Sequence, residues 1–154
     1  MESGDNINFQ TPIKYCEMMV SMLPTNCIRV LEPTPGAGNL VGAIEATGRR
    51  VTAPVNFWSV YDTFDAIVMN PPFSPMTLAY KILYRCMEMT PYIVALMPWL
   101  TLINSERRTK LISDYGLKSV THLPRSAFPG ARIQCCVLEL VQDWQGATEL
   151  KFAT

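Results

Sequence analysis

The stretch Phe64-Asp65-Ala66-Ile67-Val68-Met69-Asn70-Pro71-Pro72-Phe73 decides the fold and locates the site. Its first six residues are a mostly apolar run, which predicts a buried β-strand over residues 64–69. Pro71 and Pro72 carry no N–H group for a following helical turn, so the chain leaves the strand as a stiff loop. In α/β proteins, ligands bind at loops that follow the carboxyl ends of strands. The stretch therefore predicts a functional loop at the end of a buried strand.

This loop offers two hydrogen-bond acceptors and one ring. The side-chain oxygen of Asn70 and the carbonyl oxygen of Pro71 can both point at one ligand group, and Phe73 adds a flat apolar face. Two acceptors suit the two N–H bonds of an NH2 group, and the ring can stack on the group that carries it. The residues therefore predict a site for a planar amine. The alternative for Phe73 is packing in the core.

A glycine-containing loop follows a second predicted strand, over residues 27–31. It reads Glu32-Pro33-Thr34-Pro35-Gly36-Ala37-Gly38-Asn39 and leads into a predicted helix over residues 40–47. Gly36 and Gly38 can adopt backbone angles that are closed to other residues, which lets the chain approach a ligand closely. The first amides of the helix would face an anion. The alternative is an ordinary tight turn.

The other elements alternate in type along the chain. Apolar spacing predicts helices over residues 12–23, 76–89 and 105–115, and strands over residues 92–97, 117–123 and 134–141. This alternation predicts an α/β fold: a mostly parallel sheet with helices on both faces and an antiparallel pair, formed by the last two strands, at one edge. Residues 51–60 fit neither pattern. Residues 1–154 are expected to form a single domain.

Composition limits the classes of function. Lysine plus arginine equals aspartate plus glutamate at 13 each, so no net field draws the protein onto nucleic acid. Five cysteines without a Cys-x-x-Cys pair predict buried thiols in a reducing cytosol rather than disulfides or a metal site. No apolar run approaches the roughly 18 residues of a membrane span. We therefore expect a cytoplasmic protein that uses no metal and no membrane.

Three motifs, in this order, resemble those of the S-adenosylmethionine-dependent amino-methyltransferases, above all the DNA N6-adenine class. They are Phe9-Gln10-Thr11-Pro12, the glycine loop and Asn70-Pro71-Pro72-Phe73. Phe128-Pro129-Gly130, before the apolar residues 135–140, is similar to the late hairpin of that family. The resemblance implies a Rossmann-like class I methyltransferase fold, S-adenosylmethionine as the cofactor, and methyl transfer to the exocyclic N6 amine of adenine in DNA.

The resemblance also implies the function of individual residues. Asn70, Pro71, Pro72 and Phe73 form the catalytic loop. Glu32 faces the amino group of the cofactor, Thr11 and Pro12 line its methionine end, and Asn56 and Phe57 touch its adenine. The implied cofactor-binding set is Phe9, Thr11, Pro12, Glu32, Pro33, Gly36, Gly38, Asn56 and Phe57.

The implied chemistry is electrostatic rather than acid–base. The N6 lone pair of adenine is delocalised into the ring, and acceptance of both N–H bonds by Asn70 and Pro71 favours a nucleophilic, tetrahedral nitrogen. A base inside a duplex cannot reach such a site, so the substrate is a flipped or single-stranded adenine that stacks on Phe73. The mechanism needs no strong base, and the single histidine, His122, is interpreted as structural.

The chain departs from the family in two respects. Residues 46–61 contain no aspartate or glutamate, where the family usually holds the cofactor ribose with an acid, and the region between the second and third strands looks compressed. The chain also lacks a stretch long enough for a separate target-recognition domain, so recognition would need a partner subunit or a homodimer. Candidate phosphate contacts, each of which could instead be a solvated charge, are Arg107, Arg108, Lys110, Arg125 and Arg132.

Two other functions remain open at this level. One is methylation of a glutamine side-chain amide in a protein, or of a base in RNA, by the same Asn-Pro-Pro core. The other is a degenerate methyltransferase fold without catalysis that acts as a binding module.

Overall fold

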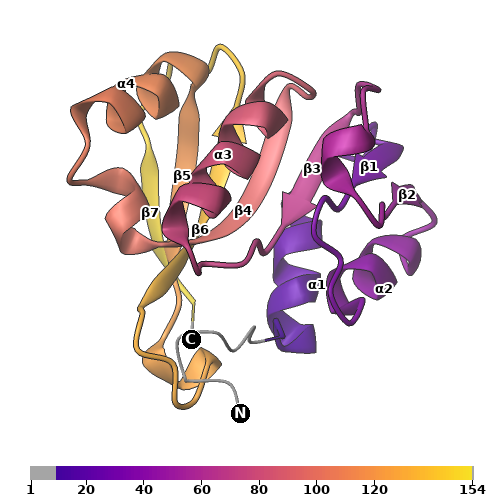
Figure 1. The fold of residues 1–154 in the computed structure, drawn as a ribbon, viewed down its shortest axis with the longest axis horizontal. Helices are drawn as coiled ribbons and strands as arrows, with labels where there is room; N and C mark the ends of the chain where they lie inside the picture. Colours follow the sequence, from indigo (N-terminus) through magenta and orange to yellow (C-terminus); the bar gives the residue numbers. More distant parts are fainter. Residues whose placement is uncertain (1–9, 154) are drawn as a thin grey trace.

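The structure is a computed structural model that describes residues 10–153. Seven strands form one sheet in the order β2-β1-β3-β4-β6-β5-β7 (Figure 1). The strands are β1 (Arg29–Leu31), β2 (Arg50–Thr52), β3 (Ala66–Met69), β4 (Tyr92–Pro98), β5 (Leu117–His122), β6 (Cys135–Val141) and β7 (Glu149–Phe152). The α-helices are α1 (Ile13–Ser21), α2 (Asn39–Glu45), α3 (Met76–Met87) and α4 (Glu106–Tyr115), and short 3-10 helices are η2 (Phe57–Ser59), η3 (Trp99–Leu102) and η4 (Arg125–Ala127).

The sheet is mostly parallel, as the sequence predicts. Strand β1 pairs in parallel with β2 and β3, and β3 pairs in parallel with β4. Strand β6 runs antiparallel to both β4 and β5. The predicted antiparallel pair is therefore present, but it does not form the outer edge, because β7 pairs in parallel with β5. Sequence reasoning missed β7, whose four residues are mostly exposed and bury no apolar face.

Alternate residues of the central strands enter two separate cores. Ala66 and Val68 on β3 pack in the cluster that includes α1 and α2. Ile67 and Met69 pack in the cluster that includes α3 and α4. Because successive side chains of a strand point to opposite faces, fully apolar strands require helices on both sides. The predicted three-layer arrangement is confirmed.

The link from β2 to β3 contains only the 3-10 helix η2 among the described elements. The sequence indicates a shortened connection between the second and third strands. The structure has one: residues 53–65 join β2 to β3 without an α-helix. The prediction of buried thiols is also confirmed, since all five cysteines are free and buried. Cys135 and Cys136 are neighbours on β6 but belong to opposite cores.

The strand order brings two loops together. From β1 the chain passes to β2 on one side and then to β3 on the other, so β1 and β3 are adjacent in the sheet. Their carboxyl-terminal loops are the glycine loop and the Asn70 loop, which meet where the strand order reverses. This is the place where open α/β sheets bind ligands. Within residues 10–153, every helix is too short or too polar to cross a membrane.

Candidate functional site

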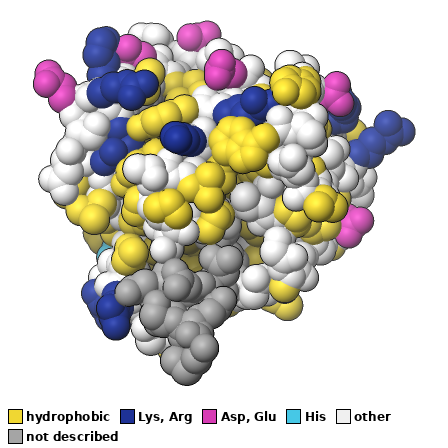
Figure 2. Space-filling model, in the orientation of Figure 1, with side chains coloured by type: hydrophobic (Ala, Val, Ile, Leu, Met, Phe, Trp, Pro, Cys, Tyr) yellow, Lys and Arg dark blue, Asp and Glu magenta, His cyan; other side chains and the backbone are white. Residues whose placement is uncertain are grey.

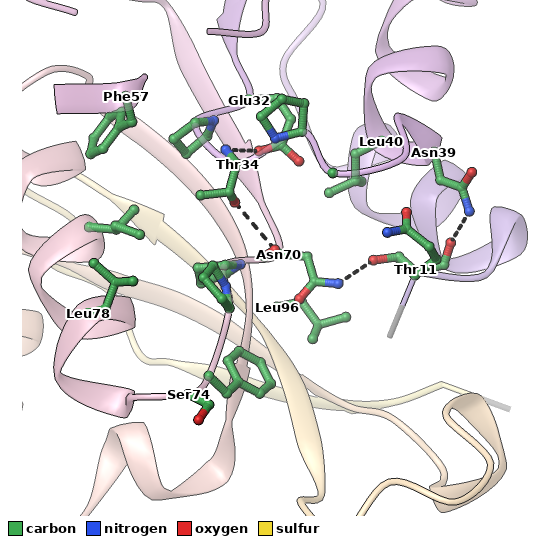
Figure 3. Close-up of a pocket in the computed structure, with 18 of the residues that line it drawn as sticks. Thr11, Glu32, Thr34, Asn39, Leu40, Phe57, Asn70, Ser74, Leu78 and Leu96 are labelled. Carbon is green, nitrogen blue, oxygen red and sulfur yellow. Dashed lines mark hydrogen bonds between the residues drawn. The ribbon is translucent and has the colours of Figure 1, made fainter. Parts of the chain in front are cut away.

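A cavity of about 710 Å³ lies where the two loops meet. Its walls come from the segment before α1, the glycine loop, the β2–β3 link, the Asn70 loop, α3 and the β5–β6 connection (Figure 3). The predicted site residues that line it are Thr11, Glu32, Pro33, Gly36, Asn56, Phe57, Asn70, Pro71, Pro72, Phe73 and Arg132. The cavity therefore unites the Asn70 loop, predicted to be catalytic, with most of the residues predicted to bind the cofactor.

Hydrogen bonds fix Asn70 against both neighbouring segments. Its Nδ2 donates to Oγ1 of Thr11 at 2.8 Å, and its backbone oxygen accepts from Oγ1 of Thr34 at 3.3 Å. Figure 3 shows these bonds as a connected line from the glycine loop to the segment before α1. Since the amide nitrogen is the donor to Thr11, the bond fixes the plane in which the amide oxygen lies. Asn70 is thus positioned before any ligand binds.

The rest of the Asn70 loop is packed against the protein rather than exposed to solvent. Pro71 is buried, and Phe73 is partly buried and packs against both cores. Phe73 also lines the cavity. The two interpretations of this ring, stacking surface and core residue, are therefore compatible: one part of the ring packs inside while another faces the cavity.

Glu32 is a buried carboxyl group at the end of β1. Its side chain is 1% exposed, and its Oε1 accepts from the backbone N–H of Thr34 at 2.7 Å. Within residues 10–153, no lysine, arginine or histidine forms an ion pair with it. Burial raises the pKa of Glu32 from 4.5 to about 8, against the lowering effect of the Thr34 hydrogen bonds. A buried carboxyl facing a cavity without a cation suits a ligand that brings a positive charge.

We predict that Glu32 makes the protein less stable as the pH rises. Between its ordinary pKa of 4.5 and about 8 the folded state holds a proton that the unfolded state has lost, so the free energy of unfolding should fall with rising pH across this window. Urea unfolding at pH 5.5 and pH 8 would measure the fall in the wild type and in Glu32→Gln. The variant should show a clearly smaller fall, and equal falls would contradict the prediction.

The glycine loop has the geometry that its sequence indicates. Gly36 has φ 53°, and a Cβ atom there would lie 3.1 Å from Nε2 of Gln10. A side chain would therefore be both strained and crowded against another residue of the cavity wall. Gly38, with φ 95°, is the N-cap of α2 and does not line the cavity. The loop is closed by the bond from Nδ2 of Asn39 to the carbonyl of Thr11, at 3.0 Å.

The β2–β3 link supplies the wall on the other side. Phe57 is buried, whereas Asn56 and Trp58 are exposed at the mouth. Oδ1 of Asn56 accepts from the backbone N–H of Trp58 at 3.1 Å and so caps η2. This wall is neutral, and the wall residues Pro54 to Trp58 include no acid. The lack of acidic residues in the sequence at 46–61 therefore leaves this wall of the cavity without a carboxylate.

Several predicted site residues lie elsewhere. Pro12 precedes α1 and does not line the cavity, although its carbonyl accepts from Tyr15 and Cys16. The expectation for Phe9 falls outside the described residues. His122 lies away from the cavity lining on β5, and its Nδ1 accepts from the indole N–H of Trp99 at 3.1 Å.

The predicted phosphate contacts do not form one group. Only Arg132 lines the cavity, and it is exposed on the β5–β6 connection. Arg107, Lys110 and Arg125 are exposed elsewhere.

Arg108 corrects the sequence prediction. The residue is 8% exposed, and its guanidinium donates to the carbonyls of Leu100, Thr101 and Ile103. Arg108 also lies 4.0 Å over the ring of Tyr80. The guanidinium is thus buried and bonded to the backbone in and next to η3. It is therefore not placed to contact phosphate.

Sequence reasoning missed part of the cavity lining. Thr34 and Asn39 lie inside the quoted glycine motif, and their hydroxyl and amide groups were available as signals. Leu78, Ile82, Leu96 and Cys135 come from segments whose pattern indicates only core packing, and Phe128 and Ile133 come from the β5–β6 connection. The remaining lining residues that were not predicted are Gln10, Pro35, Leu40, Pro54, Val55, Trp58, Ser74 and Ala131.

The sequence matches no protein-family model and no curated protein. Solved structures nevertheless share the fold. A Listeria monocytogenes protein described as a class I S-adenosylmethionine-dependent methyltransferase superposes with a TM-score of 0.71 at 13% identity, over 99% of this chain and 67% of that chain.

Modification subunits of type I restriction systems also share the fold. A subunit from Vibrio vulnificus gives a TM-score of 0.71 at 20% identity, over 95% of this chain and 46% of that one. The methyltransferase subunit from Streptococcus thermophilus gives 0.70 at 15% identity, over 88% and 45%. The chain thus spans about two thirds of the Listeria protein and less than half of each subunit. The fold is the Rossmann-like fold of class I methyltransferases, as the sequence resemblance implies.

Proposed function

We propose that this chain is an S-adenosylmethionine-dependent methyltransferase that acts on the exocyclic N6 amine of adenine in DNA. The observation that carries the proposal is the single cavity in which the Asn70 loop faces the glycine loop and Glu32. One loop has the acceptors for an amine, and the other has the features of a cofactor site. Type I modification subunits, which share the fold, are named as methyltransferases of restriction-modification systems.

The residues of the cavity fit the cofactor. Glu32 would face its ammonium group, the Gly36 turn would pass close to its methionine part, and Phe57 would pack against its adenine. The buried carboxyl without a cation and the turn that a Cβ atom would crowd are the observations behind this fit. When bound, the cofactor supplies an electrophilic methyl group. The neutral wall at Asn56 offers no charge-assisted bond to the ribose, so we expect a dissociation constant of tens of micromolar, about −6 kcal/mol.

The chain's own residues would prepare the amine. The side-chain oxygen of Asn70 and the carbonyl of Pro71 would accept its two N–H bonds, which localises the lone pair on nitrogen. Thr11 holds the Asn70 amide, so the acceptor is positioned before the substrate arrives. Phe73 would stack on the base, and its packing against both cores keeps the ring from moving away.

Binding and transfer can be tested in sequence. Calorimetry with S-adenosylhomocysteine tests the cofactor site, and labelled methyl transfer tests catalysis on adenine-containing DNA, on RNA of the same sequence and on glutamine-containing peptides. The proposal expects N6-methyladenine in DNA by mass spectrometry. Transfer only to RNA or peptide would refute the DNA assignment, and binding without transfer to any substrate would favour the binding module.

We predict that the isolated chain prefers single-stranded to duplex DNA. The side chains of lysine and arginine are scattered among apolar and acidic ones on the face in Figure 2, and the net charge is zero. Few phosphate contacts supply little counterion-release free energy to unstack a base, whereas a single strand presents its bases free. Initial rates on matched oligonucleotides should favour the single strand at least about tenfold. A faster rate on duplex DNA would contradict this.

Two arginine variants test the contribution of single phosphate contacts to single-strand binding. Arg132→Ala should weaken single-strand binding severalfold and flatten its salt dependence, because one phosphate contact contributes about −0.7 to the slope of log K against log salt. Arg107→Ala removes an exposed cation that does not line the cavity, and it should leave both quantities nearly unchanged. A partner subunit or a second copy would be needed for sequence-specific modification of a duplex.

A further inference from the structure

Arg85 on α3 is surrounded by the β2–β3 link. Its guanidinium carbon lies 5.5 Å from the ring centre of Phe57, 5.8 Å from that of Trp58 and 5.1 Å from that of Tyr61. Its Nη2 donates to the carbonyl of Val60 at 2.5 Å. Cations within about 6 Å of a ring centre are attracted by the negative face of the ring. One side chain from α3 thus contacts four residues of the link.

The last residues of the link are bonded to β1 and to Met89, whereas residues 54–61 are held mainly by the packing of Phe57 and Val60 in the core that includes α3. The hydrogen bonds of η2 stay inside the link, from Val60 N–H to the Phe57 carbonyl at 3.0 Å and from Trp58 N–H to Oδ1 of Asn56 at 3.1 Å. Among the hydrogen bonds of the described residues, only the Arg85–Val60 bond joins residues 54–61 to another part of the chain. Arg85 lies in the last turn of α3.

The contacts of Arg85 are made mainly by rings. Its Nε is buried and has no hydrogen-bond partner among residues 10–153. A buried donor without a partner costs free energy, so the ring contacts and the Val60 bond must outweigh that cost. An arginine used only to end α3 would keep its donors in water or on the last carbonyls of the helix. The orientation instead serves the link.

The same link forms a wall of the cavity. Its lining residues are Pro54, Val55, Asn56, Phe57 and Trp58. Two of the rings that surround Arg85, those of Phe57 and Trp58, therefore belong to this wall. We propose that Arg85 is a positioning residue, which holds the β2–β3 link in the conformation that receives the adenosine part of the cofactor. The identity of that ligand rests on the proposed function, whereas the hold on the link does not.

Three variants test this proposal by ligand affinity. Arg85→Met removes the cation at similar length, Arg85→Lys keeps a cation but loses the planar donor group, and Lys81→Met removes an exposed cation one turn earlier on α3. The affinities for S-adenosylhomocysteine and 5′-methylthioadenosine should fall about tenfold in Arg85→Met and about threefold in Arg85→Lys. They should not change in Lys81→Met. The affinity for L-methionine, which lacks adenosine, should not change in any variant.

A second readout needs no ligand. Nuclear magnetic resonance of the ligand-free protein reports the indole N–H of Trp58, assigned with Trp58→Phe, and this signal should shift in both Arg85 variants but not in Lys81→Met. If wild type binds no S-adenosylhomocysteine, the proposed function fails, while the indole signal still decides whether Arg85 holds the link.

Two results would overturn the proposal. One is an unchanged Trp58 signal with unchanged adenosine affinities in the Arg85 variants. The other is an equal loss for L-methionine and the adenosine ligands, as general destabilisation would produce. If Arg85→Met does not fold, Arg85→Lys decides by the same comparisons.

Discussion

Asn70→Ala is expected to reduce methyl transfer about a thousandfold or more, with S-adenosylhomocysteine binding within about twofold of wild type. The expected size follows from the loss of a positioned polar group that acts on the reacting atoms. The variant loses the hydrogen bond from Nδ2 to Thr11, and a loss of this kind lowers stability by about 1 kcal/mol. Single-turnover transfer of labelled methyl, with calorimetry on the same preparation, measures both quantities.

Thr11→Val is the matched control for Asn70. It removes the same hydrogen bond but keeps the Asn70 amide oxygen, so the rate should fall far less than in Asn70→Ala. If the rate of methyl transfer fell equally in the two variants, the loss would come from misorientation of the loop and not from the missing Asn70 acceptor. Transfer by Asn70→Ala at the wild-type rate would remove Asn70 from the mechanism.

Arg108→Ala is expected to lower the free energy of unfolding by about 3 kcal/mol. The substitution removes the guanidinium donor from the carbonyls of Leu100, Thr101 and Ile103, of which Leu100 still accepts from the backbone N–H of Ile103, and it removes the cation that lies over Tyr80. Hydrogen bonds from charged groups contribute about 1.5–3 kcal/mol each, and partial replacement by water reduces the sum. Urea unfolding monitored by circular dichroism measures the change.

Arg107→Ala tests the neighbouring residue on the same helix. Arg107 is exposed and lies 6.0 Å from the ring centre of Tyr84, so its removal should change the free energy of unfolding by about 0.5 kcal/mol or less. Equal effects of the two substitutions would contradict the assignment of Arg108 to the interior. The sequence-based expectation that both arginines contact phosphate does not distinguish them.

The positions of the two loops that line the cavity could be predicted because chemistry and strand position coincide in the chain. Residues 64–69 are apolar except for Asp65, and the loop after them carries Asn70 and two prolines, so one local stretch indicated both a buried strand and a functional end. The glycine loop after β1 could be recognised in the same way. Because β1 and β3 are adjacent and parallel, their loops had to meet at one edge of the sheet.

The features that failed depend on contacts between distant segments. Strand β7 is short and mostly exposed, and its pairing with β5 is made by backbone groups that leave no pattern of apolar side chains. Leu96 and Cys135 have the pattern of core residues, although they also line the cavity. Only the packing of their strands against the loops decides which core residues reach a ligand.

The sequence by itself determined the fold class, the order of the elements and the two loops that form the cavity, since these follow from apolar periodicity and from the stiffness of proline and freedom of glycine along the chain. The tertiary structure alone decided the state of individual charges. Burial raises the pKa of Glu32 to about 8, Arg108 is enclosed by η3 and Tyr80, and Arg85 is surrounded by the β2–β3 link. The environment of a charged side chain is set by residues remote in sequence, and burial and partners determine whether it is a surface contact, a structural bond or a ligand site.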